Sequence, residues 1–555
     1  MGDLEFRRGR VLEATTLYEE AHTRAARAGE QQLLAASLLR SALAYRELDR
    51  LDDAGNAVRR ALEIAQDTGA RWIEAEALLA SADLDRRRMR LEPALALYAE
   101  AESLLQPDLD PELLWQVHFG RAMALEAQGN LDAAIDALAS AVAVIEGVRN
   151  QLAEPRFRAG YVEDKYEVYV ELVRLQLQKG KKSDAFSTAE RLRARSYAEQ
   201  LRGRSTLPLS DEDRKTESQL RERIRQLQRV IAAEELGLDG AIRRPALARF
   251  SAELLLAERE YQAFLDDQRA SRPVDSASDL FPTSAAVQAR LRPHEALLEF
   301  VVGRASLVIF VMTERDLHAT SVSVGRAQLE ARVGLIRDLV QRPGNKQWKK
   351  PARSLAALLL DPIRSDDWLA GVQHLYIVPH GALNYLPFAA LIETVGDVDR
   401  ALVEQFTLTQ LPAAYALLNG RGTTGGEAVL AVAPSRSRLR YAPDEARSVD
   451  ELFQPNSRLL LGASATESEF KNVAAEYGVL HIATHGYFNK LNPLLSGLEL
   501  EPDASNDGLL EVFEVLGLRL RADLVTLSAC DTALGSGYFS DVPPGDEIVG
   551  MTRAF

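Results

Sequence analysis

Val479-Leu480-His481-Ile482-Ala483-Thr484-His485-Gly486 is a short apolar run that ends in a histidine and a glycine. A run of this length, bounded by a turn signal, is typical of a strand buried in a parallel sheet. Residues 522–529, with the sequence ADLVTLSA, have the same character and lead into Cys530. Because parallel strands end at a common edge of the sheet, we expect His485 and Cys530 to lie at that edge, on neighbouring strands.

Other short apolar runs between residues 289 and 555 alternate with turns and helical stretches. Residues 297–302 and 307–311 predict a hairpin, and residues 375–378 and 429–432 predict two more buried strands. Strands that alternate with helices are typical of α/β domains with a mostly parallel sheet. We therefore predict one α/β domain over residues 289–555.

The N-terminal part of the chain repeats with a period of 40 residues. The small residues of this pattern form two series, Ala14, Ala54, Ala94 and Ala134, and Ala21, Ala61, Ala101 and Ala141. Small residues recur where one helix crosses its neighbour closely, and bulky residues fill the space around them. We therefore predict a right-handed superhelix of helical hairpins over residues 1–150, similar to tetratricopeptide repeats but longer.

Three further segments separate the repeats from the α/β domain. Residues 151–205 predict an irregular terminal helical pair. Residues 206–268 carry apolar residues at alternating spacings of four and three, which indicate a helical hairpin with a coiled-coil-like seam. This hairpin is equally well interpreted as a plain spacer or as a contact surface. Residues 269–288, which contain prolines, serines and aspartates, predict a linker.

Composition limits the class of protein. The chain has 555 residues, too many for one hydrophobic core. Its 66 basic and 81 acidic residues give a net charge of -15, which disfavours direct binding of nucleic acid. The most apolar stretch, residues 297–312, contains Glu299 and Arg304, so we expect no membrane helix and no membrane partner. The N-terminus has no signal-peptide pattern. A single cysteine excludes an internal disulfide and fits a reducing cytoplasm, the location that we predict.

The imidazole of His485 and the thiol of Cys530, at one sheet edge, have the arrangement that a nucleophile–base pair needs. Gly486 lets the backbone approach a substrate carbonyl, and the N–H groups of Gly486 and Cys530 can then hold an oxyanion. Taken alone, a single cysteine is usually a small buried hydrophobic residue, and a His-Gly pair after a strand is often a turn. Their combination at the ends of two strands favours the catalytic interpretation.

Residues 481–486 (HIATHG) and 527–535 (LSACDTALG) resemble the signatures of the CHAT domain. This caspase-like peptidase domain occurs with tetratricopeptide repeats and is related to separase, caspases and gingipains. Residues 377–383 (IVPHGAL) resemble the first core strand of the family and its turn. The resemblance implies a cysteine endopeptidase with His485 and Cys530 as its catalytic dyad. It also implies hydrolysis of peptide bonds without a metal or an organic cofactor.

Other polar residues of these motifs have different expected roles. Asp531 either orients the cysteine loop or lines the specificity pocket, and both roles remain open. His481 alternates with His485 along the strand, so we expect it to face a neighbouring element in a structural role. His380 stands where the family more often has an aspartate, and we interpret it as a loop residue.

The same resemblance predicts that the chain is a fragment at both ends. It implies a further core strand and a substrate-pocket segment beyond Phe555, and Gly2 already lies inside the first repeat helix. Two functions then compete. The first is a regulated cysteine endopeptidase that cleaves protein substrates and whose repeat groove binds a protein or peptide partner. The second is a catalytically silent scaffold. The missing pocket favours the scaffold for residues 1–555, whereas the intact dyad favours the peptidase for the whole protein.

Overall fold

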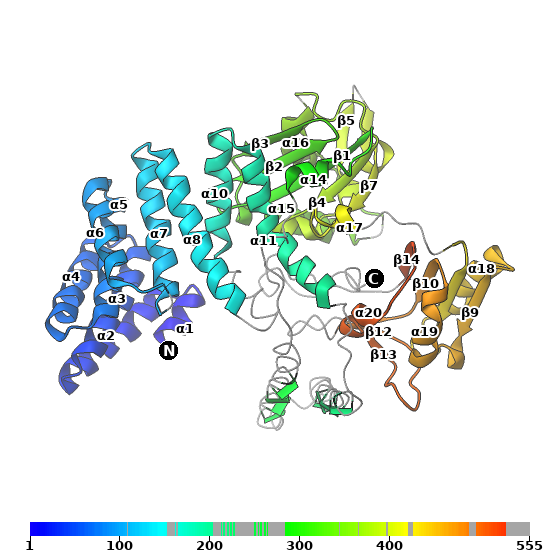
Figure 1. The fold of residues 1–555 in the computed structure, drawn as a ribbon, viewed down its shortest axis with the longest axis horizontal. Helices are drawn as coiled ribbons and strands as arrows, with labels where there is room; N and C mark the ends of the chain where they lie inside the picture. Colours follow the sequence, from blue (N-terminus) through cyan, green and yellow to red (C-terminus); the bar gives the residue numbers. More distant parts are fainter. Residues whose placement is uncertain are drawn as a thin grey trace.

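The computed structural model contains a helical arm and a region of β-sheets with flanking helices (Figure 1). The described residues are 1–107, 109–151, 161, 165–203, 283–342, 344–364, 366–395, 398–419, 426–487 and 496–528, with single residues and pairs between 213 and 264. The predicted coiled-coil-like hairpin and the linker lie largely outside these ranges and stay predictions. Within the hairpin segment, Arg223 and Glu260 form an ion pair of 2.6 Å that joins its two halves.

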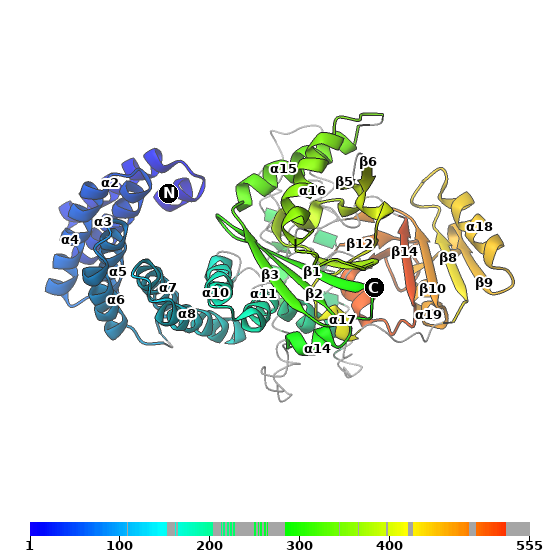
Figure 2. The same ribbon diagram turned by 90° about the horizontal axis from the view of Figure 1, so that it is seen from above.

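The arm is a stack of helices in which each helix packs against its neighbours along the chain (Figures 1 and 2). Its helices are α1 (Gly2–Arg7), α2 (Val11–Ala28), α3 (Gln31–Glu47), α4 (Leu51–Thr68), α5 (Arg71–Arg87), α6 (Leu91–Leu104), α7 (Pro111–Ala127) and α8 (Leu131–Gln151). Helices α4, α6 and α8, which carry Ala54, Ala94 and Ala134, follow one another in sequence order. The predicted helical repeats are confirmed, and the handedness and groove of the superhelix stay predictions.

The same period occurs in the backbone at the turn inside each hairpin. The φ angles are 75° at Gly9, 59° at Asp49, 58° at Met89 and 84° at Gly129. All four lie in the left-handed region, which glycine adopts more easily than other residues. Two of the four residues, Asp49 and Met89, are not glycine. The positions of the glycines in the sequence therefore do not show that these turns repeat every 40 residues.

The alanines of the repeat pattern lie where the helices touch. All members of the first series are at most 1% exposed: Ala14, Ala54, Ala94 and Ala134. In the second series Ala61, Ala101 and Ala141 are buried, but Ala21 is exposed. Helix α1 has six residues and meets α2 near Tyr18, because a Cβ on Gly2 would lie 2.5 Å from the Tyr18 ring. It therefore leaves the surface around Ala21 uncovered.

The first sheet has five strands in the order β3-β2-β1-β4-β7. Its strands are β1 (Glu295–Val302), β2 (Leu307–Thr313), β3 (Leu317–Val322), β4 (His374–Val378) and β7 (Thr407–Gln410). The predicted hairpin is confirmed, because β1 and β2 pair antiparallel. Strand β4 lies parallel to both β1 and β7. A separate two-stranded sheet is formed by β5 (Ile392–Val395) and β6 (Val398–Ala401).

Helices cover both faces of the first sheet. They are α10 (Tyr166–Gln178), α11 (Lys182–Gly203), α14 (Ser284–Gln288), α15 (Arg326–Val340), α16 (Lys349–Arg364) and α17 (Ala416–Asn419). Leu298 and Phe300 of β1 pack with residues of α15 and α16. Leu297 and Val301 alternate with them and pack on the other face with residues of α10, α11, α14 and α17. Helices α10 and α11 continue the stack of the arm, because α10 packs against α8, and both are part of the core of the first sheet.

The second sheet has four parallel strands in the order β14-β10-β8-β9. Its strands are β8 (Val429–Ala433), β9 (Ser457–Leu461), β10 (Val479–Ala483) and β14 (Leu524–Ser528). One face packs against α18 (Ala442–Phe453), and the other faces α19 (Glu467–Val473) and α20 (Val512–Gly517). A small antiparallel sheet follows β10 and consists of β11 (Gly486–Tyr487), β12 (Gly497–Glu499) and β13 (Leu509–Glu511).

The predicted fold class, helical repeats followed by a region with a parallel sheet, is confirmed. The division of the strands between two sheets is not apparent from the sequence. Strands β4 and β8 have the same short apolar character, and only their tertiary partners assign them to different sheets. Within the described ranges, no helix combines the length and the apolar character needed to cross a lipid bilayer.

Candidate active site at the end of the parallel sheet

The strands that lead to His485 and Cys530 are direct neighbours. Strands β10 and β14 pair in parallel, from Val479 opposite Leu524 to Ala483 opposite Ser528. The last of these pairs is completed by the amide of Thr484, which donates a hydrogen bond to the carbonyl oxygen of Ser528 at 3.2 Å. The predicted adjacency of the two strands is therefore observed.

His485 follows directly and is half-buried. Its backbone is held by β12, because its carbonyl oxygen accepts a hydrogen bond from the amide of Glu499 at 2.9 Å. The hydroxyl of the preceding residue, Thr484, is buried and donates to the carbonyl oxygen of Glu499 at 2.6 Å. The backbone of Glu499 thus contacts the chain at two consecutive positions, Thr484 and His485.

Gly486 is the first residue of β11 and lies opposite Leu498 of β12. Hydrogen-bonded and non-hydrogen-bonded pairs alternate along an antiparallel ladder. The bond between His485 and Glu499 identifies Gly486 and Leu498 as a non-hydrogen-bonded pair. The amide of Gly486 consequently points away from β12 and is not used in the ladder.

Cys530 and Asp531 lie outside the described residues, so their predicted roles stay predictions. The described part of β14 ends at Ser528, two positions before the cysteine. The expected sulfur–imidazole approach of Cys530 and His485 is a prediction for the same reason.

The other two histidines of the motifs have structural partners. His481 lies 2.9 Å from Glu445 of α18, measured between Nε2 and Oε1, so it faces a neighbouring element as expected. His380 follows β4, in the first sheet, and lies in the loop before the short helix that starts at Gly381, where it is buried. Its Nδ1 accepts a hydrogen bond from the amide of Val302 at 2.8 Å. Burial, together with the charges of Arg193 and Arg326, holds the pKa of His380 well below its ordinary value.

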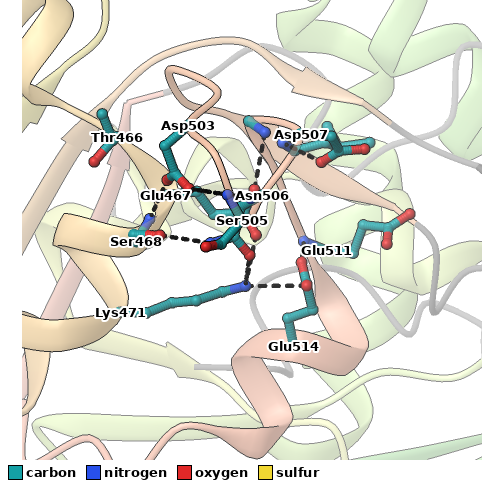
Figure 3. A network of polar contacts seen from close by, with 12 residues as sticks. Thr466, Glu467, Ser468, Lys471, Asp503, Ser505, Asn506, Asp507, Glu511 and Glu514 are labelled. Carbon is teal, nitrogen blue, oxygen red and sulfur yellow. Dashed lines mark hydrogen bonds and ion pairs between the residues drawn. The ribbon is translucent and has the colours of Figure 1, made fainter. Parts of the chain in front are cut away.

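A buried polar cluster lies where the start of α19 meets α20 and the turn between β12 and β13 (Figure 3). Glu467, at the start of α19, is 1% exposed and accepts hydrogen bonds from Lys471 at 2.5 Å and from the amide of Gly508 at 2.9 Å. The ammonium of Lys471 also contacts Glu514 of α20 at 3.0 Å and the side-chain oxygen of Asn506 at 3.1 Å. Burial and the neighbouring charge of Glu514 raise the pKa of Glu467 to about 7, although Lys471 opposes the shift.

Sequence patterns alone do not single out these supporting residues. Thr484 belongs to the HIATHG motif, but its bond to Glu499 joins positions 15 residues apart. Glu467 and Glu514 come together only because α19 and α20 lie on the same face of the second sheet. No group of histidine, cysteine and acidic side chains suited to a metal ion occurs within the described ranges.

Residues 349–555 match the family model of the CHAT domain. This region is therefore similar to the CHAT domain, a domain of the caspase-like peptidase clan. The match begins at the first residue of α16 and includes β4 and the whole second sheet. Strands β1 to β3 and the helical arm precede it.

No curated protein sequence matches this chain. Among solved structures, a kinesin light chain of Podospora anserina with TPR-like repeats has 17% identity and a TM-score of 0.27, over 34% of this chain and 89% of its own. BtubC of P. vanneervenii has 22% identity and a TM-score of 0.28, over 35% of this chain and 75% of its own. A Rap protein complexed with competence and sporulation factor has 17% identity and a TM-score of 0.30, over 49% of this chain and 74% of its own.

Proposed function

We propose that this protein is a cysteine endopeptidase of the caspase-like type, with Cys530 as nucleophile and His485 as general base and acid. The observation that carries the proposal is the register of β10 and β14. Paired residues differ by 45 in number, as in Ala483 and Ser528. His485 and Cys530 also differ by 45, and each follows the last ladder pair by two positions. Continuing that register makes them neighbours across a strand spacing of about 5 Å.

In the proposed reaction, the sulfur of Cys530 attacks the carbonyl carbon of the scissile peptide bond, and its proton passes to His485. The carbonyl oxygen becomes an oxyanion that the N–H groups of Gly486 and Cys530 hold. His485 gives the proton to the leaving amine as the C–N bond breaks. Water then hydrolyses the thioester, which releases the acid and restores the thiol. The outward amide of Gly486 supports its assigned role, and Asp531 either orients the cysteine loop or contacts the substrate.

We further propose that the arm binds a protein or peptide partner and regulates the peptidase. Stacked helical hairpins form extended surfaces suited to such partners. The arm also shares a core with the first sheet, and Glu190 of α11 accepts the amides of Ala414 and Tyr415 at 3.1 and 3.0 Å. A partner that moves α11 would therefore act on the chain that leads into the second sheet. A single cysteine suits a reducing compartment, so we propose a cytoplasmic location.

The test is a cleavage assay on the full-length protein with candidate partners and protein substrates, combined with a thiol-directed activity probe. In residues 1–555, which contain one cysteine, labelling by the probe reports on Cys530 alone. Cys530→Ala should abolish labelling and cleavage, and His485→Ala should lower cleavage by about 10³-fold or more. His481→Gln is the matched control and should keep cleavage within about threefold, because its ring contacts α18.

Cleavage that persists in Cys530→Ala would refute the mechanism. A protein that binds partners through its arm but cleaves nothing under any condition would be the silent scaffold instead.

A further inference from the structure

The polar cluster around Glu467 is connected to His485 through a short series of backbone hydrogen bonds. Glu467 accepts the amide of Gly508, and the carbonyl oxygen of Gly508 accepts the amide of Leu500 at 2.8 Å. Leu500 directly follows Glu499, whose backbone holds Thr484 and His485. Each step is a contact between described residues. The segment 497–511, which contains β12, β13 and the turn between them, therefore contacts both Glu467 and His485.

A second connection joins the start of α19 to the same segment. The amide of Glu467 donates to the carbonyl oxygen of Glu501 at 3.1 Å, and the amide of Glu501 donates to Ala465 at 2.9 Å. Asp503 accepts the amide of Ser468 at 2.9 Å (Figure 3). The turn that links β12 to β13 is thus fixed to α19 by both backbone and side chains.

We propose that Glu467 and Lys471 are positioning residues for His485, because they hold the segment 497–511 that brackets the histidine. An effect on catalysis rests on the proposed function. The positioning of His485 is a property of the fold and does not depend on it. The cluster is unbalanced, because two carboxylates, Glu467 and Glu514, contact one ammonium. When both carboxylates are ionised, one negative charge remains uncompensated in a buried place, and binding of one proton removes it.

The charges that face Glu467 come from every element packed around it. Lys471 lies on the same helix, Glu514 on α20, and Asp503 and Asp507 in the turn before β13. Arg436, in the loop after β8, donates to the carbonyl oxygen of Asp507 at 2.9 Å. Burial is the largest cause of the raised pKa of Glu467, and the excess of acidic over basic groups in this set adds to it.

The sign of the pH effect follows from linkage. The pKa of Glu467 is about 7 in the closed structure, and it returns toward its ordinary value of 4.5 when the segment opens to water. A raised pKa in the closed state means that protonation favours closing. The closed segment is therefore most stable, relative to the opened one, below about pH 4.5. This stability decreases as the pH rises to about 7 and is constant above that.

The experiment measures amide hydrogen exchange of Glu499, Leu500 and Gly508 in the full chain between pH 5 and 8, corrected for intrinsic exchange rates. In the wild-type protein, the opening equilibrium of these amides should rise about 10- to 100-fold over this range. Glu467→Gln mimics the protonated carboxyl and should remove the pH dependence. Lys471→Met leaves the two carboxylates without their shared cation and should raise opening at pH 8 by about tenfold or more.

Glu469→Gln is the matched control. Glu469 lies on the same helix, but its partner is Arg458 of β9, and both side chains are more than a third exposed. This variant should exchange like the wild-type protein. Equal pH dependence in Glu467→Gln and the wild type, or equal effects of Glu469→Gln and Lys471→Met, would overturn the proposal.

The link to His485 is measured by NMR on protein with labelled histidine, which is tractable because the sequence has eight histidines. The His485 resonance should shift with the opening of the segment in the wild type and in Lys471→Met, and Glu467→Gln should reduce this shift. A His485 resonance that is the same in the wild type and in these variants would overturn the positioning role. Both measurements work in the absence of cleavage, so a failed peptidase assay and a failed positioning role are separate outcomes.

Discussion

The amide of Thr484 and the carbonyl oxygen of Ser528 form a hydrogen bond of 3.2 Å immediately before the two predicted catalytic residues. It belongs to the last pair of the ladder of β10 and β14, Ala483 and Ser528, because in a parallel ladder the residue after one paired residue bonds to the other. In a parallel sheet a slip by one residue turns every side chain to the opposite face. The bond therefore helps to fix the register of the two strands that lead to His485 and Cys530.

Thr484→Val should weaken this part of the structure. The change keeps the shape but removes the hydroxyl that donates to Glu499, which leaves the carbonyl oxygen of Glu499 with one donor fewer. We expect a loss of about 1–2 kcal/mol in the free energy of unfolding, measured in urea. We also expect a lower kcat with little change in KM if the protein is a peptidase. Thr484→Ser restores the hydroxyl and should recover most of both quantities; failure of this rescue would contradict the assigned bond.

Gly508→Ala should be more destabilising than an ordinary change at a left-handed glycine. Gly508 has a φ of 81°, and a Cβ at this position would lie 2.6 Å from the carbonyl oxygen of Leu500. Gly344 has a φ of 75° with no atom within 4 Å of its Cβ position, so Gly344→Ala isolates the backbone strain. We expect about 1 kcal/mol for Gly344→Ala and at least about 2 kcal/mol for Gly508→Ala in thermal or urea unfolding. Similar losses would show that the segment 497–511 adapts to the extra methyl group.

Arg193→Met should strongly destabilise the junction between the arm and the first sheet. Arg193 is buried, contacts Glu299 at 2.6 Å and also donates to the carbonyl oxygen of Phe300. Its loss leaves the carboxyl of Glu299 buried without its cation, and we expect a cost of about 3–5 kcal/mol in urea unfolding. Adding Glu299→Leu should recover part of that cost. Arg24→Met, which removes an exposed pair with Glu20, should change stability by less than about 0.5 kcal/mol.

His380 should make the first sheet sensitive to acid. Burial and the charges of Arg193 and Arg326 depress its pKa, so the folded protein keeps the imidazole neutral while the unfolded chain takes up a proton below about pH 6.5. Stability from this group is thus present above pH 6.5 and falls as the pH decreases, by up to about 1.4 kcal/mol per pH unit.

His380→Asn keeps an acceptor for the amide of Val302 but cannot titrate. Urea unfolding between pH 7 and 5 should therefore show a smaller loss of stability in this variant than in the wild type. The comparison isolates the histidine, because both proteins retain Glu190 and Glu299, whose pKa values are raised by burial and which act in the opposite direction. The same slope in both proteins would be evidence against the role of His380.

The sequence predicts those parts of the structure that depend on local pattern. The alanine period marks the helical repeats, and the two apolar runs before His485 and Cys530 predict neighbouring strands, as the pairing of Val479 with Leu524 shows. The surroundings of these strands depend on residues far apart in the sequence. Glu190 contacts the backbone 224 residues further along at Ala414, and no local pattern indicates such a contact. For the same reason the sequence did not reveal that α10 and α11 belong to the core of the first sheet.

Helix α11 ends at Gly203 and α14 begins at Ser284, yet the two helices touch on the same face of the first sheet. The contact lies in the first half of α11, because Ala185, Phe186 and Ala189 pack in one cluster with Val287 of α14. The entropic cost of closing a long loop grows only slowly with its length. A change in the length of the connection between Gly203 and Ser284 should therefore cost the first sheet little stability, because both helices are held by their own packing on the sheet.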